Sequence, residues 1–151
     1  MATFGIFTAG QVLTAAELNG GGAYTAYTPT YTNVTIGNGT SAFSYMQFNK
    51  FVHVEGRFTL GTTSAITGLI TMTLPVNASN TYNRTLGTCS FTDAGIASYP
   101  AFPNLKDEDE VYLFAINSAG TYTVEAASSA TVPFTWGNTD YFAVNLIYRA
   151  A

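Results

Sequence analysis

Lys50-Phe51-Val52-His53-Val54-Glu55-Gly56-Arg57-Phe58-Thr59-Leu60 is the stretch of sequence that decides the fold. Apolar side chains recur at every second position, interrupted by one glycine, and the alternate positions are mainly polar or charged. The apolar face comprises Val52, Val54, Phe58 and Leu60, and the opposite face comprises Phe51, His53, Glu55, Arg57 and Thr59. A period of two residues is typical of a β-strand that buries one face. The stretch therefore predicts a strand over 50–60 that packs against a core.

Similar strand signals recur on both sides of this stretch. One strand ends at Pro75, and the last strand again alternates apolar and polar side chains. Strands are predicted at 26–35, 41–48, 50–60, 65–74, 86–92, 94–99, 110–117, 121–126, 131–136 and 140–149. Turns rich in Gly and Asn separate several of them, as in hairpins. The pattern predicts an all-β fold, an antiparallel β-sandwich of the jelly-roll type, as one domain over 23–151.

One predicted strand breaks the alternation. Between Glu110 and Asn117 both faces are apolar, which is typical of a strand that is buried on both sides. In a two-layer sandwich one side of each sheet should face water, so either a loop or another subunit must cover the second face. We favour another subunit and expect a homo-oligomer. The candidate subunit-interface residues are Val111, Tyr112, Leu113 and Phe114.

The N-terminal residues predict a short helix on a flexible joint. Thr14 can cap the helix and Glu17 can reach back to the Thr14 amide, while Gly20-Gly21-Gly22 ends the helix and frees the chain. A helix of one or two turns is not stable alone, so segment 1–22 must dock on its own sandwich, on a second copy or on another protein. We expect an anchor to another protein. Its candidate anchoring side chains are Phe4, Ile6, Phe7, Val12, Leu13 and Leu18.

The composition is poor in charge and rich in aromatic residues. Charged residues make up 9% of the chain and aromatic residues 15%, whereas ordinary globular domains carry roughly 25% charge. Such a surface is either covered by neighbouring subunits or simply neutral. The net charge is −4 and the five basic residues are scattered, so no nucleic-acid partner is expected. No apolar run is long enough to span a bilayer, so no membrane insertion is expected either.

Candidate catalytic groups are few. His53 is the only histidine, and we expect it to pair with Glu55 or Arg57 or to contact a subunit. The single Cys89 cannot form an internal disulfide and is expected to be buried. The run 106–110 carries acids that could bind Ca²⁺, but it lacks the glycine and the downstream acid of an EF-hand loop, so a solvated loop is favoured. We expect no enzymatic activity, no cofactor and no metal site.

Two long connections, 75–84 and 100–109, are candidate binding loops. Aromatic rings in and beside them could stack on sugar rings, with Asn side chains nearby as hydrogen-bonding groups. The candidate glycan contacts are Tyr82, Tyr99 and Phe102. The alternative, which we favour, is that these rings plug the ends of the sandwich or contact a neighbouring subunit.

The block Phe7-Thr8-Ala9-Gly10-Gln11-Val12-Leu13-Thr14-Ala15-Ala16-Glu17-Leu18-Asn19 resembles the opening of many small tail and fibre proteins of tailed bacteriophages. Looser similarity continues at 27–31, 60–68, 132–136 and 140–142. The resemblance implies a virion surface protein without catalytic residues, assembled in the bacterial host cytoplasm, trimeric, and joined to other virion proteins through its N-terminus. A minor tail or tail-fibre protein with a role in host adsorption is favoured over a capsid decoration protein or head fibre. A free-standing carbohydrate-binding module and a small depolymerase are the remaining alternatives.

Overall fold

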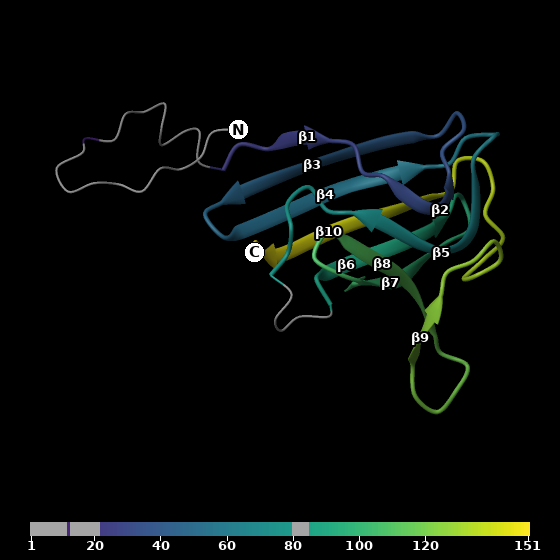
Figure 1. The fold of residues 1–151 in the computed structure, drawn as a ribbon. Coiled ribbons are helices and arrows are strands. Elements are labelled where there is room, and N and C mark those ends of the chain that lie inside the picture. Colours follow the sequence, from purple (N-terminus) through teal and green to yellow (C-terminus); the bar gives the residue numbers. More distant parts are fainter. Residues whose placement is uncertain (1–11, 13–21, 80–84) are drawn as a thin grey trace.

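The computed structural model of the chain describes residue 12 and residues 22–79 and 85–151, and the regular elements in these ranges are β-strands (Figure 1). The strands are β1 (Thr25–Tyr27), β2 (Tyr31–Thr35), β3 (Thr40–Phe48), β4 (Phe51–Thr59), β5 (Ala65–Thr73), β6 (Gly87–Asp93), β7 (Ala97–Leu105), β8 (Glu110–Asn117), β9 (Val124–Ala127) and β10 (Tyr141–Arg149). The predicted all-β class is confirmed. The predicted N-terminal helix lies outside the described residues.

The strands form one antiparallel sheet in the order β1-β3-β4-β10-β6-β7-β8-β5-β2, with β9 attached to β8. The sheet curls until its two edge strands, β1 and β2, are joined by only three residues around the fully buried Pro29. This curl lays β2 and β5 over β3, β4 and β10. The Tyr31 ring of β2 therefore packs on Phe58 at 5.4 Å and on Phe142 at 5.8 Å between ring centroids. The result is the predicted sandwich-like pair of layers around one core.

The deciding strand, β4, lies in the middle of one layer. It pairs with β10 from Tyr141↔Thr59 to Arg149↔Phe51 and with β3 along its other edge. Its predicted core side chains are all buried: Val52 0%, Val54 0%, Phe58 0% and Leu60 3% exposed. The glycine that interrupts the pattern has a packing reason, because a Cβ at Gly56 would lie 2.3 Å from the Phe43 ring. Gly56 thus lets Phe43 of the neighbouring strand lie across β4.

Two predicted strands are wrong in extent because proline acts differently at each. The strand predicted over 26–35 is two strands, since the chain turns the corner between the layers at Pro29. The strand predicted over 94–99 instead continues through Pro100 and Pro103 to Leu105 as β7. A proline removes only the ladder bond that its own N–H would make, and the register on β6 and β8 continues past both prolines. The predicted binding loop 100–109 is therefore mostly strand.

The strand predicted over 131–136 is a loop that closes one end of the sandwich. Val132 makes only an isolated bridge with Ser129. The apolar side chains that suggested a strand point into the core instead: Phe134 is 8% exposed and packs on Tyr99 at 5.3 Å, and Trp136 packs on Phe91 at 5.3 Å. Apolar residues at every second position of this loop fill the end of the sandwich without strand pairing. The same alternation in a sequence is also typical of a strand, so the sequence alone does not distinguish the two.

Candidate functional site

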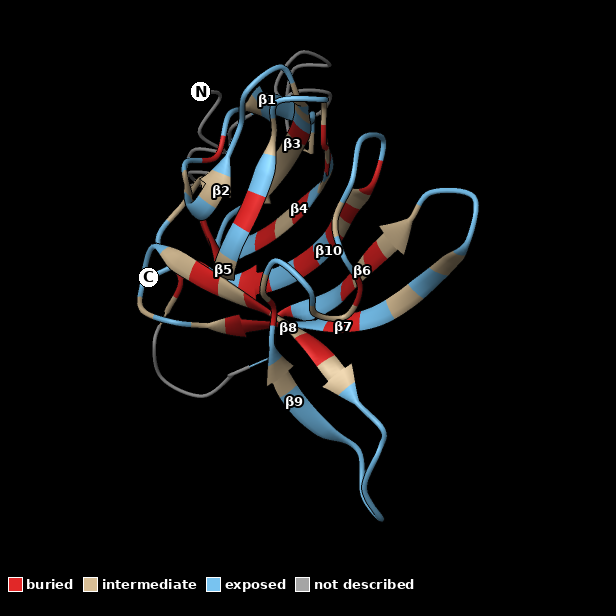
Figure 2. Cartoon of the chain, turned by 90° about the vertical axis from the view of Figure 1, so that its right-hand side faces the viewer, coloured by how far each residue is buried: buried red, intermediate tan, exposed pale blue. Residues whose placement is uncertain are grey.

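The outer face of β3, β4, β10, β6 and β7 lies opposite the core, and among the described strands none lies over it (Figure 2). Strand register defines its rows. One row across the strands consists of Ala42, Arg57, Ala143, Ser90 and Pro100, and the next consists of Ser44, Glu55, Asn145 and Thr88. Small, hydroxyl and amide side chains dominate both rows, and each row carries a single charge. The face is therefore nearly neutral and low in relief.

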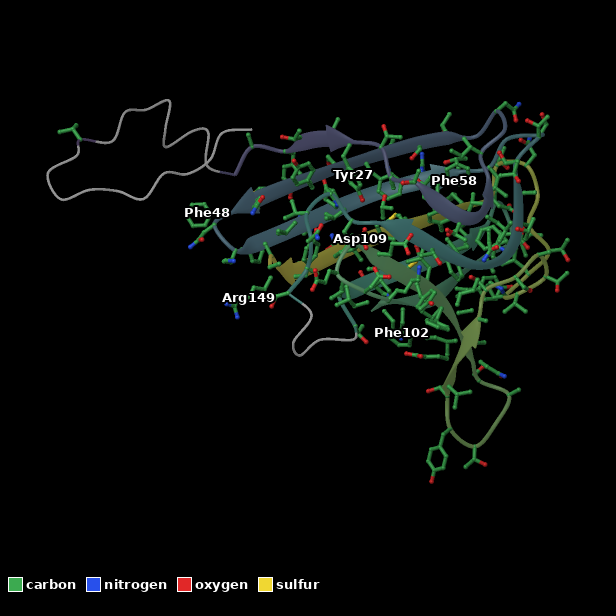
Figure 3. All side chains as sticks on the ribbon, viewed as in Figure 1. Tyr27, Phe48, Phe58, Phe102, Asp109 and Arg149 are labelled. Atoms are coloured by element: carbon green, nitrogen blue, oxygen red, sulfur yellow. The ribbon has the colours of Figure 1, made fainter. Side chains whose placement is uncertain are left out.

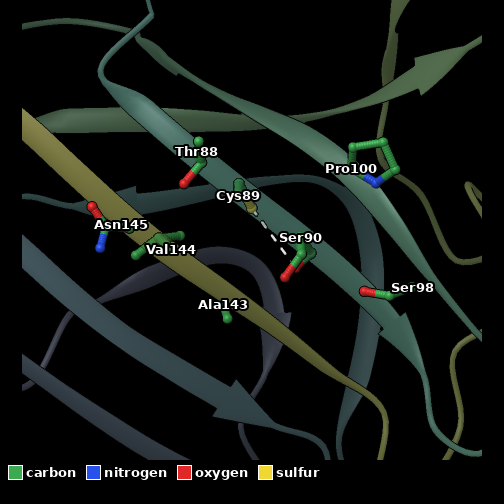
Figure 4. Close-up of a pocket in the computed structure, with 8 residues that line it drawn as sticks. All are labelled: Thr88, Cys89, Ser90, Ser98, Pro100, Ala143, Val144 and Asn145. Atoms are coloured by element: carbon green, nitrogen blue, oxygen red, sulfur yellow. Dashed lines mark hydrogen bonds between the residues drawn. The ribbon is translucent and has the colours of Figure 1, made fainter.

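A shallow hollow lies on this face over β6, β7 and β10 (Figure 4). Its volume is about 440 Å³, and its lining residues are Thr88, Cys89, Ser90, Ser98, Pro100, Ala143, Val144 and Asn145. The Ser98 hydroxyl is paired with Thr92 at 2.9 Å. Burial raises the pKa of the Cys89 thiol, so the thiol stays protonated and is a poor nucleophile. The predicted burial of Cys89 is confirmed at 6% exposure. The hollow can therefore make van der Waals contacts and a few hydrogen bonds through its hydroxyl groups with a molecule that binds on it.

His53 is held on the outer face by partners other than those predicted. Its Nδ1 lies 2.7 Å from the Tyr24 hydroxyl and its Nε2 lies 3.2 Å from Oδ1 of Asn145. A neutral ring protonated on Nε2 satisfies both contacts, because Tyr24 then donates to Nδ1 and Nε2 donates to Asn145. The prediction that Glu55 or Arg57 pairs with His53 is wrong. The Arg57 guanidinium instead lies over the Tyr141 ring, 5.0 Å from its centroid.

β8 presents different side chains to its two faces, which divides the predicted interface residues. Val111 and Leu113 are 0% exposed and belong to the core of their own chain, so they offer no surface to a partner. Tyr112 and Phe114 lie on the outer face, half-buried, with their rings 5.7 Å apart. Phe102 of β7 is opposite Phe114 and 39% exposed (Figure 3). These three rings form an outer aromatic row, Phe102-Phe114-Tyr112.

The structure does not bring the candidate glycan contacts together. Tyr82 lies outside the described residues. Tyr99 packs inward on Phe134, whereas Phe102 points outward from the same strand, so the two rings are on opposite faces of β7. Asn104, named as a possible hydrogen-bonding group, is 2% exposed and already donates to Glu125 at 2.5 Å. The described members of the set therefore form no common site.

The acidic run 106–110 is a short turn between β7 and β8. Lys106 pairs with Glu110 across the turn and lies 3.7 Å from Asp107. A hydrogen bond with Asp107 raises the pKa of the Asp109 carboxyl. Within the described ranges, no group of three or more His, Cys, Asp or Glu side chains is arranged to hold a metal ion.

The outer face has a second feature, which we call the apolar end and which the alternation of the strands did not predict. It lies where β3, β4 and β10 meet, at the end of the molecule from which Phe48 and Arg149 project (Figure 3). It consists of Met46, Phe48, Phe51 and Ile147, with Lys50 and Arg149 at its rim. The sequence feature that could have predicted the apolar end is the presence of Phe51 and Ile147 at positions where the alternation favours polar residues.

Comparison with known proteins gives no relative: no protein family, no curated protein and no solved structure matches the chain. Among the described residues, no helix has the length and apolarity needed to cross a membrane.

Proposed function

We propose that the chain is a non-catalytic structural protein of a bacteriophage particle, exposed on the particle surface as a minor tail or tail-fibre protein. The observation that carries this proposal is the outer face of the sheet. It is nearly neutral, shallow and built from small hydroxyl and amide side chains, with aromatic and apolar side chains at its margins. A surface of this kind suits contact with other protein subunits, because it carries few charges to desolvate.

The N-terminal block supports the particle as the place of assembly. Its resemblance to the opening of phage tail and fibre proteins covers residues 7–19, which precede the sandwich. Attachment through these residues leaves the outer face and the loops of the sandwich turned toward neighbouring subunits or the host surface. An adsorption role follows from that exposure.

The outer aromatic row supports a homo-oligomer, which we propose is a trimer. Phe102, Phe114 and Tyr112 present adjacent rings on one face, and aromatic residues are enriched in subunit interfaces. This proposal replaces the four-residue interface expected from the sequence, since Val111 and Leu113 are committed to the core.

The test is the composition and the infectivity of purified particles of the phage that encodes the chain. Mass spectrometry of gradient-purified particles should detect the protein at a fixed copy number. Antibody fragments against the sandwich should bind intact particles, and a block of adsorption would place the chain at the tail. Binding without a block of adsorption would favour the capsid alternative. Absence of the protein from pure particles would contradict the proposal, and specific binding of the isolated chain to a glycan array would then favour a carbohydrate-binding module.

A further inference from the structure

The apolar end is, besides the outer aromatic row, a place on the described surface where large apolar side chains lie next to each other on the outer face. Phe51 is 44% exposed and Ile147 is 51% exposed, and strand register places Phe48 beside Phe51. A hollow of about 350 Å³ lies between Phe51, Ile147 and the basic residues at the rim. The exposed Ile96 and Val124, by contrast, stand singly on separate hairpins. Contiguous apolar surface of this kind marks an interaction site.

We propose that residues 1–21 of the same chain dock on the apolar end through apolar side chains other than Val12, which is 86% exposed. The chain enters the described region beside this surface, since a Cβ placed on Gly22 would lie 3.3 Å from Sδ of Met46. Two residues on, the Tyr24 hydroxyl bonds to His53, which lies between Met46 and Ile147 in the strand register. The segment therefore starts at the edge of the surface, and a short tether of this kind raises the local concentration to about the millimolar range.

The chemistry of the segment matches that of the surface. Apolar side chains are frequent in residues 1–21, and Glu17 is the only acidic residue there. The surface is apolar with two cations at its rim, and no described ion pair includes Arg149. The same rim disfavours a second copy as the occupant through the same surface, because Lys50 and Arg149 of one copy would then face those of the other.

Docking within the chain has a consequence for assembly. Except for the exposed Val12, the apolar side chains that would cover the apolar end are the same ones that are candidates for anchoring the chain to a particle. The two uses exclude each other, so a free chain keeps its anchor covered until a partner displaces it. The docking itself concerns the free chain and does not rest on the proposed function.

Thiol reactivity in the full-length chain tests the inference. Ile147→Cys places a reporter thiol in the apolar end, and Val124→Cys places a matched reporter of similar exposure, 56% before substitution, on β9. The native Cys89 is buried and does not compete. Each reporter is combined with Phe7→Asp plus Leu13→Asp, which adds charge to the apolar segment. The matched control is Thr8→Asp plus Gln11→Asp, which adds the same charge at polar positions.

Docking predicts that Phe7→Asp plus Leu13→Asp speeds the reaction of the apolar-end thiol with a water-soluble disulfide reagent by about tenfold or more, because a docked segment must open before the thiol can react. The β9 thiol should react at one rate in all backgrounds, and the polar control should leave the apolar-end thiol slow. That slow rate should not change with protein concentration. Equal rates for the apolar-end thiol in all backgrounds would overturn the inference, and protection that grows with concentration would overturn it in favour of a second copy.

Discussion

The Tyr27 hydroxyl is buried among aromatic rings, and no described residue offers it a hydrogen-bond partner. Its ring packs edge-on against Phe43 and Tyr45, both at 5.8 Å. The Tyr148 hydroxyl is a useful contrast, because it donates to the carbonyl of Val76 at 2.8 Å. Both rings pack on the core, but of the two hydroxyl groups only that of Tyr148 has a hydrogen-bond partner among the described residues.

Tyr27→Phe should therefore leave the free energy of unfolding unchanged or raise it by up to about 1 kcal/mol, since it removes a buried polar atom that has no partner. Tyr148→Phe should lower the free energy of unfolding by about 1 kcal/mol, because it leaves the Val76 carbonyl without its donor. Urea denaturation of the two variants beside the parent chain measures the difference. A Tyr27→Phe variant as destabilised as Tyr148→Phe would show that the hydroxyl has a partner after all.

At the scale of the strands, alternation predicted β4, β5 and β10 well, because each of them buries one face against the core. It failed where another constraint decided the structure. β7 continues through two prolines because its neighbours supply the register, and the loop over 131–136 carries strand-like residues because it plugs the sandwich. The candidate site could not be predicted in the same way. Alternation assigns each side chain to one of the two faces of its strand, but it does not say which outward side chains become neighbours across five strands.

One junction between strands depends on a single hydroxyl. β5 and β9 follow one another along the same edge of β8, and Ser128 sits where one ends and the other begins. Its hydroxyl accepts from the Ile70 amide at 2.9 Å and donates to the Leu113 carbonyl at 3.0 Å. The residue is 1% exposed, so water cannot replace it.

Ser128→Ala should lower the free energy of unfolding by about 1–3 kcal/mol, because it leaves a buried amide and a buried carbonyl unpaired. Ser98→Ala is the control, since Ser98 is exposed and its substitution should change stability by less than about 0.5 kcal/mol. Denaturant unfolding measures the stability of both variants, and their midpoints are compared with the parent chain at an unchanged slope of the free energy against denaturant concentration. Equal midpoints for the two variants would remove Ser128 from this role.

At the scale of the whole molecule, the buried tyrosines of the aromatic core make the free energy of unfolding depend on pH in the alkaline range. Burial raises the pKa of Tyr31 to about 12 and also raises the pKa of Tyr27 and Tyr148 above the ordinary value of 10.0. The folded chain thus holds these protons more tightly than the unfolded chain. Stability from these groups is fully present below pH 10 and is lost as pH rises from 10 toward 12.

We therefore expect the melting temperature to be insensitive to tyrosine ionisation below pH 10 and to fall steeply above it. Tyrosinate absorbance should show Tyr27, Tyr31 and Tyr148 titrating only as the chain unfolds. Tyr122→Phe is the control, because that ring is 82% exposed and its loss should not change the fall. A melting temperature that stayed level up to pH 12 would contradict this account of the core.

The oligomer is tested at the same scale. Phe114→Asp places a carboxylate in the outer aromatic row, so it should dissociate an oligomer that uses the row, because burying an unpaired charge costs several kcal/mol. Light scattering should show the parent chain as an oligomer and the variant as a folded monomer. Ile96→Asp, on the β6–β7 hairpin tip, should leave the mass unchanged. A parent chain with a stable mass of 16.0 kDa at all concentrations would end the oligomer proposal.

We propose that the chain is a surface component of a phage particle, and a cryo-EM reconstruction of intact particles tests this central claim most directly. The account predicts density for the curled ten-stranded sheet on the outside of the tail, with residues before Gly22 contacting the particle and the outer aromatic row facing another subunit. Particles reconstructed to side-chain detail with no density that accommodates this sheet on tail or capsid would contradict the claim.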